Sequence, residues 1–238
     1  MVQPIILATV GFKMPLDFPL IHHNSIASII NKYKESHKIQ WTSFNLGWVG
    51  LAYRYRAMVE YDEQFTSYIR ISASPSPEER YAQSKSLFGF FTNGLSTLEC
   101  LFFSMYCIGA ILDASLFPIS KDKDLKFYPE KVISKFMIGF NNDALSNEMK
   151  ALLTHNEWIE LENIRNVLRH RVELPRTFYK GGDLNGMTTI PANPKAIPNQ
   201  WQFDFSVNDK TTALYRAWLV KELTALIVEL DNFCKRKL

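Results

Sequence analysis

Cysteine is scarce in this sequence, which has three among 238 residues: Cys100, Cys107 and Cys234. Their number is odd, and Cys100 and Cys107 lie within an apolar run, so we expect buried free thiols rather than a disulfide framework. Free thiols favour a reducing compartment, and we therefore expect a cytoplasmic protein. No set of histidines, cysteines and carboxylates has metal-ligand spacing, so we expect neither a metal site nor a cofactor.

Long uninterrupted apolar runs and a strong excess of charge are also missing. The most membrane-like stretch, residues 86–112, contains Glu99, and each charge-free half is shorter than the ~20 residues that a span needs. We interpret it as the central helix of a bundle and expect no membrane partner; the alternative is a membrane-associated protein that uses this segment as its membrane helix. The apolar segment 4–10 follows no Lys or Arg, so a signal peptide is not expected. The net charge of +3 permits a nucleic-acid partner without requiring one.

Motifs of several enzyme classes are absent as well. The glycine-rich segment 181–186 lacks the Lys-Ser/Thr of a phosphate-binding loop, and the chain has no Gly-x-Ser-x-Gly nucleophile elbow. A mobile turn is therefore the better interpretation of that segment. The sequence therefore has neither the phosphate-binding loop of a nucleotide hydrolase nor the nucleophile elbow of a serine hydrolase.

Helical periodicity dominates what is present. We predict an all-α antiparallel helical bundle with four to six main helices, in which residues 1–40 are an N-terminal extension packed on the bundle and residues 41–238 form the helical domain. Ser76, Pro77 and Glu79 form a capping box that starts the longest helix. The helices are predicted at 21–33, 46–71, 76–113, 129–137, 143–153, 154–175 and 208–233.

An irregular insertion, residues 173–207, interrupts this pattern before the last helix. It contains four prolines and the glycine-rich segment, and a connection of this length is typically functional. Residues 201–205 alternate like a short strand, with which residues 187–190 could pair. The insertion lies next to the part of the chain in which chemistry is expected.

That part is the string Arg165-Asn166-Val167-Leu168-Arg169-His170. The apolar stripe of its helix consists of Trp158, Leu161, Ile164 and Leu168. Asn166 and His170 are four residues apart, so they share a face, and this face lies nearly opposite the stripe. Arg165 lies at the flank of the stripe, and Arg169 lies between Arg165 and that face. A solvated basic helix end is the alternative, because cations in the last turn complement the helix dipole.

The string resembles the Arg-polar-x-x-x-His signature of the HEPN superfamily (higher eukaryotes and prokaryotes nucleotide-binding). The predicted setting is similar as well, because members of that superfamily are all-α bundles with the motif on a late helix. The resemblance implies a metal-independent endoribonuclease, with the role of a toxin or phage-defence effector. Its catalytic residues would be Arg165, Asn166 and His170. We expect Arg169, Arg171 and Arg176 to bind substrate.

The resemblance also implies a homodimer in which two motifs face one cleft. RNA would be the substrate, and an antitoxin or other regulatory protein is a further candidate partner. Histidine exchanges protons near neutral pH and arginine matches phosphate oxygens, which suits RNA cleavage. Some members keep the fold without cleaving RNA, so the alternative is a catalytically inactive module for dimerisation or for binding a partner or nucleotide.

Overall fold

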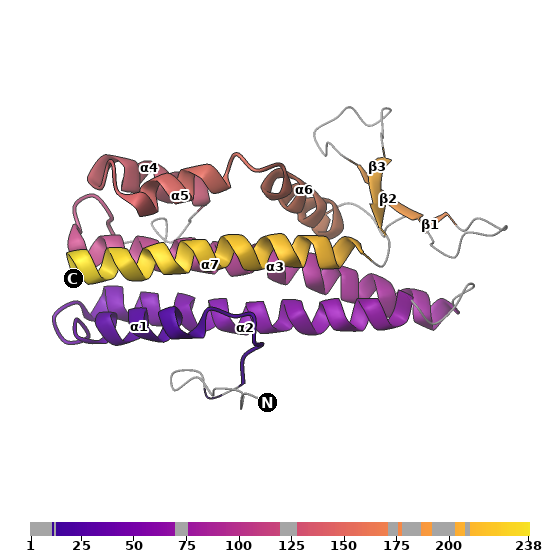
Figure 1. The fold of residues 1–238 in the computed structure, drawn as a ribbon, viewed down its shortest axis with the longest axis horizontal. Helices are drawn as coiled ribbons and strands as arrows, with labels where there is room; N and C mark the ends of the chain where they lie inside the picture. Colours follow the sequence, from indigo (N-terminus) through magenta and orange to yellow (C-terminus); the bar gives the residue numbers. More distant parts are fainter. Residues whose placement is uncertain are drawn as a thin grey trace. The chain divides into compact units, whose positions relative to one another are not determined.

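A computed structural model describes residues 11, 13–69, 76–119, 128–170, 176–177, 187–191, 203–207 and 210–238 of the 238-residue chain. Its helices are α1 (Leu20–Asn31), α2 (Lys38–Ile69), α3 (Pro77–Leu112), α4 (Pro129–Gly139), α5 (Ala144–Leu152), α6 (Asn156–His170) and α7 (Thr211–Lys237). Its strands are β1 (Arg176–Thr177), β2 (Met187–Pro191) and β3 (Phe203–Val207) (Figure 1). The predicted all-α helical bundle is confirmed.

The start of α3 follows the capping box that the sequence predicts. The backbone N–H of Glu79 donates to the hydroxyl of Ser76 at 3.2 Å, and the backbone N–H of Ser76 donates to the carboxylate of Glu79 at 2.6 Å. These bonds satisfy two donors that a helix end otherwise leaves unpaired. The N-terminal boundary of the longest helix is therefore fixed by its local sequence.

The strands between α6 and α7 form one antiparallel sheet in the order β1-β2-β3. Ile190 of β2 pairs with Phe205 of β3, and Thr188 pairs with Val207. The predicted pairing of residues 187–190 with the following strand is confirmed, whereas Trp201 and Gln202 lie outside the described residues. Strand β2 lies against α6, so the predicted insertion contacts the motif helix.

Contacts divide the chain into two compact units. Unit 1 comprises Met1–Arg56, Ser96–Thr154 and Val220–Leu238, and unit 2 comprises Ala57–Leu95 and His155–Leu219. Three of the boundaries fall inside α2, α3 and α7, and the fourth falls between α5 and α6. The predicted N-terminal extension belongs to unit 1, in which the Tyr33 hydroxyl donates to the carbonyl of Leu238 at 2.6 Å.

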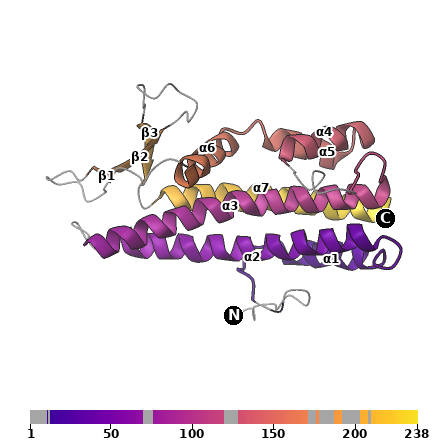
Figure 2. The ribbon, with the colours of Figure 1, turned by 180° about the vertical axis from the view of Figure 1, so that it is seen from behind.

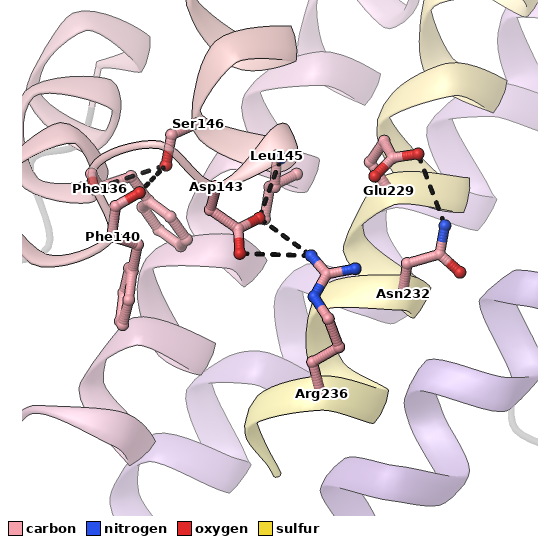
Figure 3. Close-up of polar contacts among 8 residues, drawn as sticks. All are labelled: Phe136, Phe140, Asp143, Leu145, Ser146, Glu229, Asn232 and Arg236. Carbon is pink, nitrogen blue, oxygen red and sulfur yellow. Dashed lines mark hydrogen bonds and ion pairs between the residues drawn. The ribbon is translucent and has the colours of Figure 1, made fainter.

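Within unit 1, the helix pair α4–α5 is held to the end of α7 by the aspartate that caps α5. Asp143 accepts the backbone N–H of Leu145 at 3.1 Å and so caps α5. The guanidinium of Arg236 on α7 lies 3.0 and 3.2 Å from the two carboxylate oxygens of Asp143 (Figure 3). Ser146 adds a bond from its hydroxyl to the carbonyl of Phe140 at 3.0 Å. One carboxylate thus serves a local and a tertiary contact.

Helix α3 passes a length and hydropathy test for a membrane span, as the sequence of residues 86–112 suggested. Of its most apolar 18-residue window, 72% is buried inside the protein. The side chains of Leu98, Leu101 and Ile108 are fully buried. This burial is what a helix at the centre of a core requires, because its apolar residues face protein on most sides.

Candidate functional site

The motif helix α6 belongs to unit 2 and buries the apolar stripe that the sequence predicts. Trp158, Leu161 and Ile164 are 4%, 0% and 3% exposed. Leu168, the last residue of the predicted stripe, is half-buried. The stripe therefore fixes which side of α6 faces the core along most of its length.

Two polar contacts fasten α6 to the beginning of α7. The Tyr215 hydroxyl donates to the carboxylate of Glu160. Burial, and then this hydrogen bond, raise the pKa of Tyr215 well above its usual value, so the phenol keeps its proton. The indole N–H of Trp218 donates to Nδ1 of His155 at 3.4 Å. These contacts set the position and rotation of α6, and Figure 2 shows the helix beside the start of α7.

The structure brings the motif residues onto one continuous helix. Arg165 and Asn166 lie on α6 and are both half-buried. The flanking position predicted for Arg165 agrees with this exposure. Asn166, which the wheel places on the outward face, has that face partly covered.

Several predicted site residues are described only in part. Arg169 and His170 are in the last turn of α6 and Arg176 is in β1, but their side chains lie outside the described part of the structure. Arg171 lies outside it entirely. On an ideal helix, the spacing of four residues still places His170 on the face of Asn166.

The thiols are free and unsuited to nucleophilic chemistry. Cys107 and Cys234 are buried, and Cys100 is half-buried. Burial raises the pKa of both Cys107 and Cys234 to about 12, so these thiols stay protonated near neutral pH. Among the described residues, no group of three histidines, cysteines or carboxylates is arranged to hold a metal ion.

A second polar cluster, in unit 1, escaped the sequence reasoning. The carboxylate of Asp231 on α7, with its side chain 1% exposed, lies 2.8 Å from Nδ1 of His22. It also accepts from the Ser25 hydroxyl and from the Lys235 ammonium, both at 2.7 Å. Burial acts to raise the pKa of Asp231, but the bonds from Lys235, Ser25 and His22 outweigh it and hold the pKa below its usual value. Asp231 is therefore a buried anion.

Only short-range parts of this cluster were visible in the sequence. Asp231 and Lys235 are four residues apart on one helix, and His22 and Ser25 are three apart on another. Such pairs are common on solvated helix surfaces, so neither pair alone indicates a buried polar cluster.

Comparison with known proteins returned no relative. No family model matches the chain, and searches of the curated proteins and of the solved structures found no match either. The roles of α6 and of the Asp231 cluster are accordingly inferred from their own residues and contacts.

Proposed function

We propose that this protein is a metal-independent endoribonuclease, in which Arg165 and His170 of α6 act together on RNA. The observation that carries the proposal is the continuous helix Asn156–His170. Arg165 and His170, the two ends of the HEPN-like string, therefore belong to one rigid element. A site on a packed helix keeps its side chains in a fixed relation to each other. The contacts of Glu160 and His155 to α7 supply that rigidity.

The chemistry follows from the residue types. His170 removes the proton from a ribose 2′-hydroxyl, and that oxygen attacks the adjacent phosphorus. The bond from phosphorus to the 5′-oxygen breaks, and this oxygen takes up a proton as it leaves. The products are a 2′,3′-cyclic phosphate and a 5′-hydroxyl. Arg165 stabilises the charge that builds up on the phosphate oxygens.

The remaining polar residues have supporting roles in this proposal. Asn166 orients His170 or the substrate by a hydrogen bond, and Arg169, Arg171 and Arg176 bind the phosphates on either side of the cleaved bond. The protein acts as a homodimer in the cytoplasm, with two copies of the motif at one cleft. A toxin or phage-defence role follows from the HEPN resemblance, and an antitoxin or other regulatory protein would then be its partner.

The test is cleavage of a labelled RNA by the full-length protein in the presence of EDTA. We expect 2′,3′-cyclic phosphate ends, and no cleavage of the same sequence with 2′-O-methyl riboses, because the attacking oxygen is then blocked. Arg165→Ala and His170→Ala should each reduce the rate at least 100-fold. Arg80→Ala and His37→Ala, which alter the same residue types elsewhere, are the matched controls. Unchanged cleavage by the His170 variant would refute the assignment.

The dimer is tested in the same experiment. If two motifs share one cleft, the rate per molecule should fall when the protein is diluted below the dissociation constant of the dimer. Sedimentation measured over the same concentrations gives that constant independently. A rate per molecule that stays constant through dissociation would contradict a composite site.

A second candidate function is favoured by the contact of β2 with α6. Strand β2 of the insertion lies on the motif helix, and Asn166 of that helix is half-buried. Both observations fit a helix whose motif face is covered by the insertion and binds no substrate. The chain would then be a catalytically inactive helical module that dimerises or binds a partner or nucleotide. Folded wild-type protein that cleaves no RNA, but forms a stable dimer, would favour this candidate over the enzyme.

A further inference from the structure

An open cavity of about 360 Å³ lies in unit 1. Its walls are residues of the segment 14–19 and of the beginning of α1, together with Thr224 and Val228 of α7. Met14 and Phe18 line it and are 6% and 5% exposed, so the inner part of the wall is fixed by the core. The volume is in the range of sites for small molecules, which are likewise lined mainly by apolar side chains with a few polar groups.

The polar groups of this wall carry no net charge. Of the described residues that line the cavity, only His22 and Thr224 have polar side chains, and none is an aspartate, glutamate, lysine or arginine. Asp231, to which His22 is bonded, forms an ion pair with Lys235 at 2.7 Å, so these two charges balance each other. A charged ligand would therefore lose hydration without gaining an opposite charge. The wall favours a neutral ligand.

His22 presents a hydrogen-bond acceptor to this cavity in a fixed orientation. Its Nδ1 lies 2.8 Å from the carboxylate of Asp231, which can only accept, so Nδ1 carries the hydrogen. Since Lys235 already balances Asp231, a neutral imidazole satisfies the cluster, and its Nε2 is then an acceptor. In the described part of the chain Nε2 has no hydrogen-bond partner, and the side chain is 38% exposed. A ligand that reaches this nitrogen must donate a hydrogen bond.

The mouth of the cavity adds an apolar rim. Leu16 and Ile21 line it and are 85% and 76% exposed. An aliphatic chain that covers them removes apolar surface from water, which favours binding. The ligand chemistry that fits is therefore an aliphatic chain ending in a neutral donor. A hydroxyl group meets this requirement, whereas an ether oxygen or a carboxylate can only accept.

From these observations we propose that the cavity binds a neutral aliphatic alcohol. Its hydroxyl donates a hydrogen bond to Nε2 of His22, and its chain lies against Leu16, Phe18 and Val228. The oriented ring places the acceptor before the ligand arrives, as in histidines that a carboxylate holds. This binding is independent of the proposed ribonuclease activity, because all residues named for it belong to unit 1 and α6 belongs to unit 2.

Calorimetry on the full chain with 1-octanol and its isomer 1-methoxyheptane tests the proposal. The two molecules contain the same atoms, and only the alcohol can donate. Octanol should bind about fivefold more tightly than the ether, which is the effect of one hydrogen bond. Each methylene that enters the cavity should tighten Kd about fourfold, so octanol should bind about 15-fold more tightly than 1-hexanol. No octanol binding, equal binding of alcohol and ether, or tighter binding of octanoate than of octanol overturns the proposal.

Two variants separate the hydrogen bond from the cavity. His22→Asn keeps an N–H group for Asp231 and removes the acceptor at Nε2, so octanol should bind only as tightly as methoxyheptane, whose Kd should not change. Val228→Trp fills the cavity and should weaken both ligands. His37→Asn, outside the cavity, is the control, and circular dichroism checks that each variant is folded.

Three results of these experiments contradict the proposal. The first is octanol binding that His22→Asn leaves unchanged, because the acceptor would then be elsewhere. The second is binding that Val228→Trp leaves unchanged, because the ligand would then lie outside the cavity. The third is a cavity covered by a second copy, shown by a dimer that Leu16→Ser dissociates and octanol does not affect.

Discussion

His23, on α1, is expected to make the free energy of unfolding of this protein depend on pH. The side chain is fully buried, and its ring stacks on Trp48 with centroids 4.5 Å apart and planes inclined by 11°. Phe18 packs against the same ring, with centroids 5.2 Å apart. Nε2 lies 3.4 Å from the carbonyl oxygen of Trp48, and the indole of Trp48 donates to the carbonyl of His23 at 3.2 Å.

These surroundings disfavour the protonated, positively charged form of His23. Burial lowers its pKa from 6.5 to about 4, and the hydrogen bond to the Trp48 carbonyl offsets only part of this effect. In the unfolded chain the ring is solvated and has its ordinary pKa of 6.5. Between these two values the unfolded state binds more protons than the folded state, so the free energy of unfolding falls as the pH falls.

The magnitude follows from the difference in pKa. The contribution is fully present above about pH 7, begins to be lost near pH 6.5, and is lost completely below about pH 4. The full difference corresponds to about 3 kcal/mol, of which about 2 kcal/mol is lost at pH 5. Against a typical total of roughly 5–15 kcal/mol, this is a large effect for one side chain.

The assay is urea unfolding of wild type and His23→Phe at several pH values between about 4 and 7. Phenylalanine retains the stacking on Trp48 and cannot be protonated. At each pH, the free energy of unfolding of His23→Phe is subtracted from that of wild type. The carboxylates titrate equally in both proteins and cancel, so the change of this difference with pH reports on His23. We expect wild type to lose about 2 kcal/mol more than His23→Phe between pH 7 and pH 5.

The control is His37→Phe, which removes a histidine that is not in this core. Its free energy of unfolding should keep the pH dependence of wild type. If wild type and His23→Phe show parallel pH profiles, His23 titrates normally in the folded protein, and the reasoning from its burial is refuted.

Two further predictions concern packing and capping in unit 1. Gly109→Ala would place a methyl group 2.7 Å from the buried ring of Phe117 and should cost about 1–3 kcal/mol in urea unfolding. Gly50→Ala, whose nearest neighbour lies at 3.4 Å, should be neutral or stabilise α2 by up to about 1 kcal/mol, and equal effects of the two alanines would contradict the close packing at 109. Asp143→Ala removes the cap of α5 and the partner of Arg236, and should cost about 1–2 kcal/mol. Asp143→Asn keeps the cap and should cost less than Asp143→Ala in thermal unfolding. Equal costs would show that the ion pair with Arg236, which both variants remove, dominates.

The helices were predictable because their signals are local. Ser76 and Glu79 fix the start of α3 through bonds that span three residues, and Asp143 caps α5 in the same way. The start of α2 was placed near Leu46, whereas the helix begins at Lys38. Phe44, four residues before Trp48 and buried like it, extends the same apolar face toward the N-terminus. That periodicity was present in the sequence, although no capping residue marked the true start.

The division into two units could not be read from the sequence. Each unit is assembled from segments that are far apart along the chain, and three of the four boundaries fall inside continuous helices. Linkers rich in proline or glycine mark domains that follow one another in sequence, and here no such linker exists at the boundaries. The insertion between α6 and α7 was recognised as irregular, and its strand pairing followed from alternation because the two strands are close in sequence.

The two candidate sites differ in the kind of information that specifies them. The Arg165–His170 string consists of six consecutive residues. The apolar pattern of a single helix was therefore enough to predict that Arg165 and Asn166 lie on α6. The Asp231 cluster joins residues 209 positions apart in the sequence, and no periodicity relates His22 to Asp231. A reading of local patterns therefore finds motifs on single elements and misses sites that packing creates. Because the two clusters share no residue and belong to different units, a substitution in one, such as His170→Ala, should leave the contacts of the other unchanged.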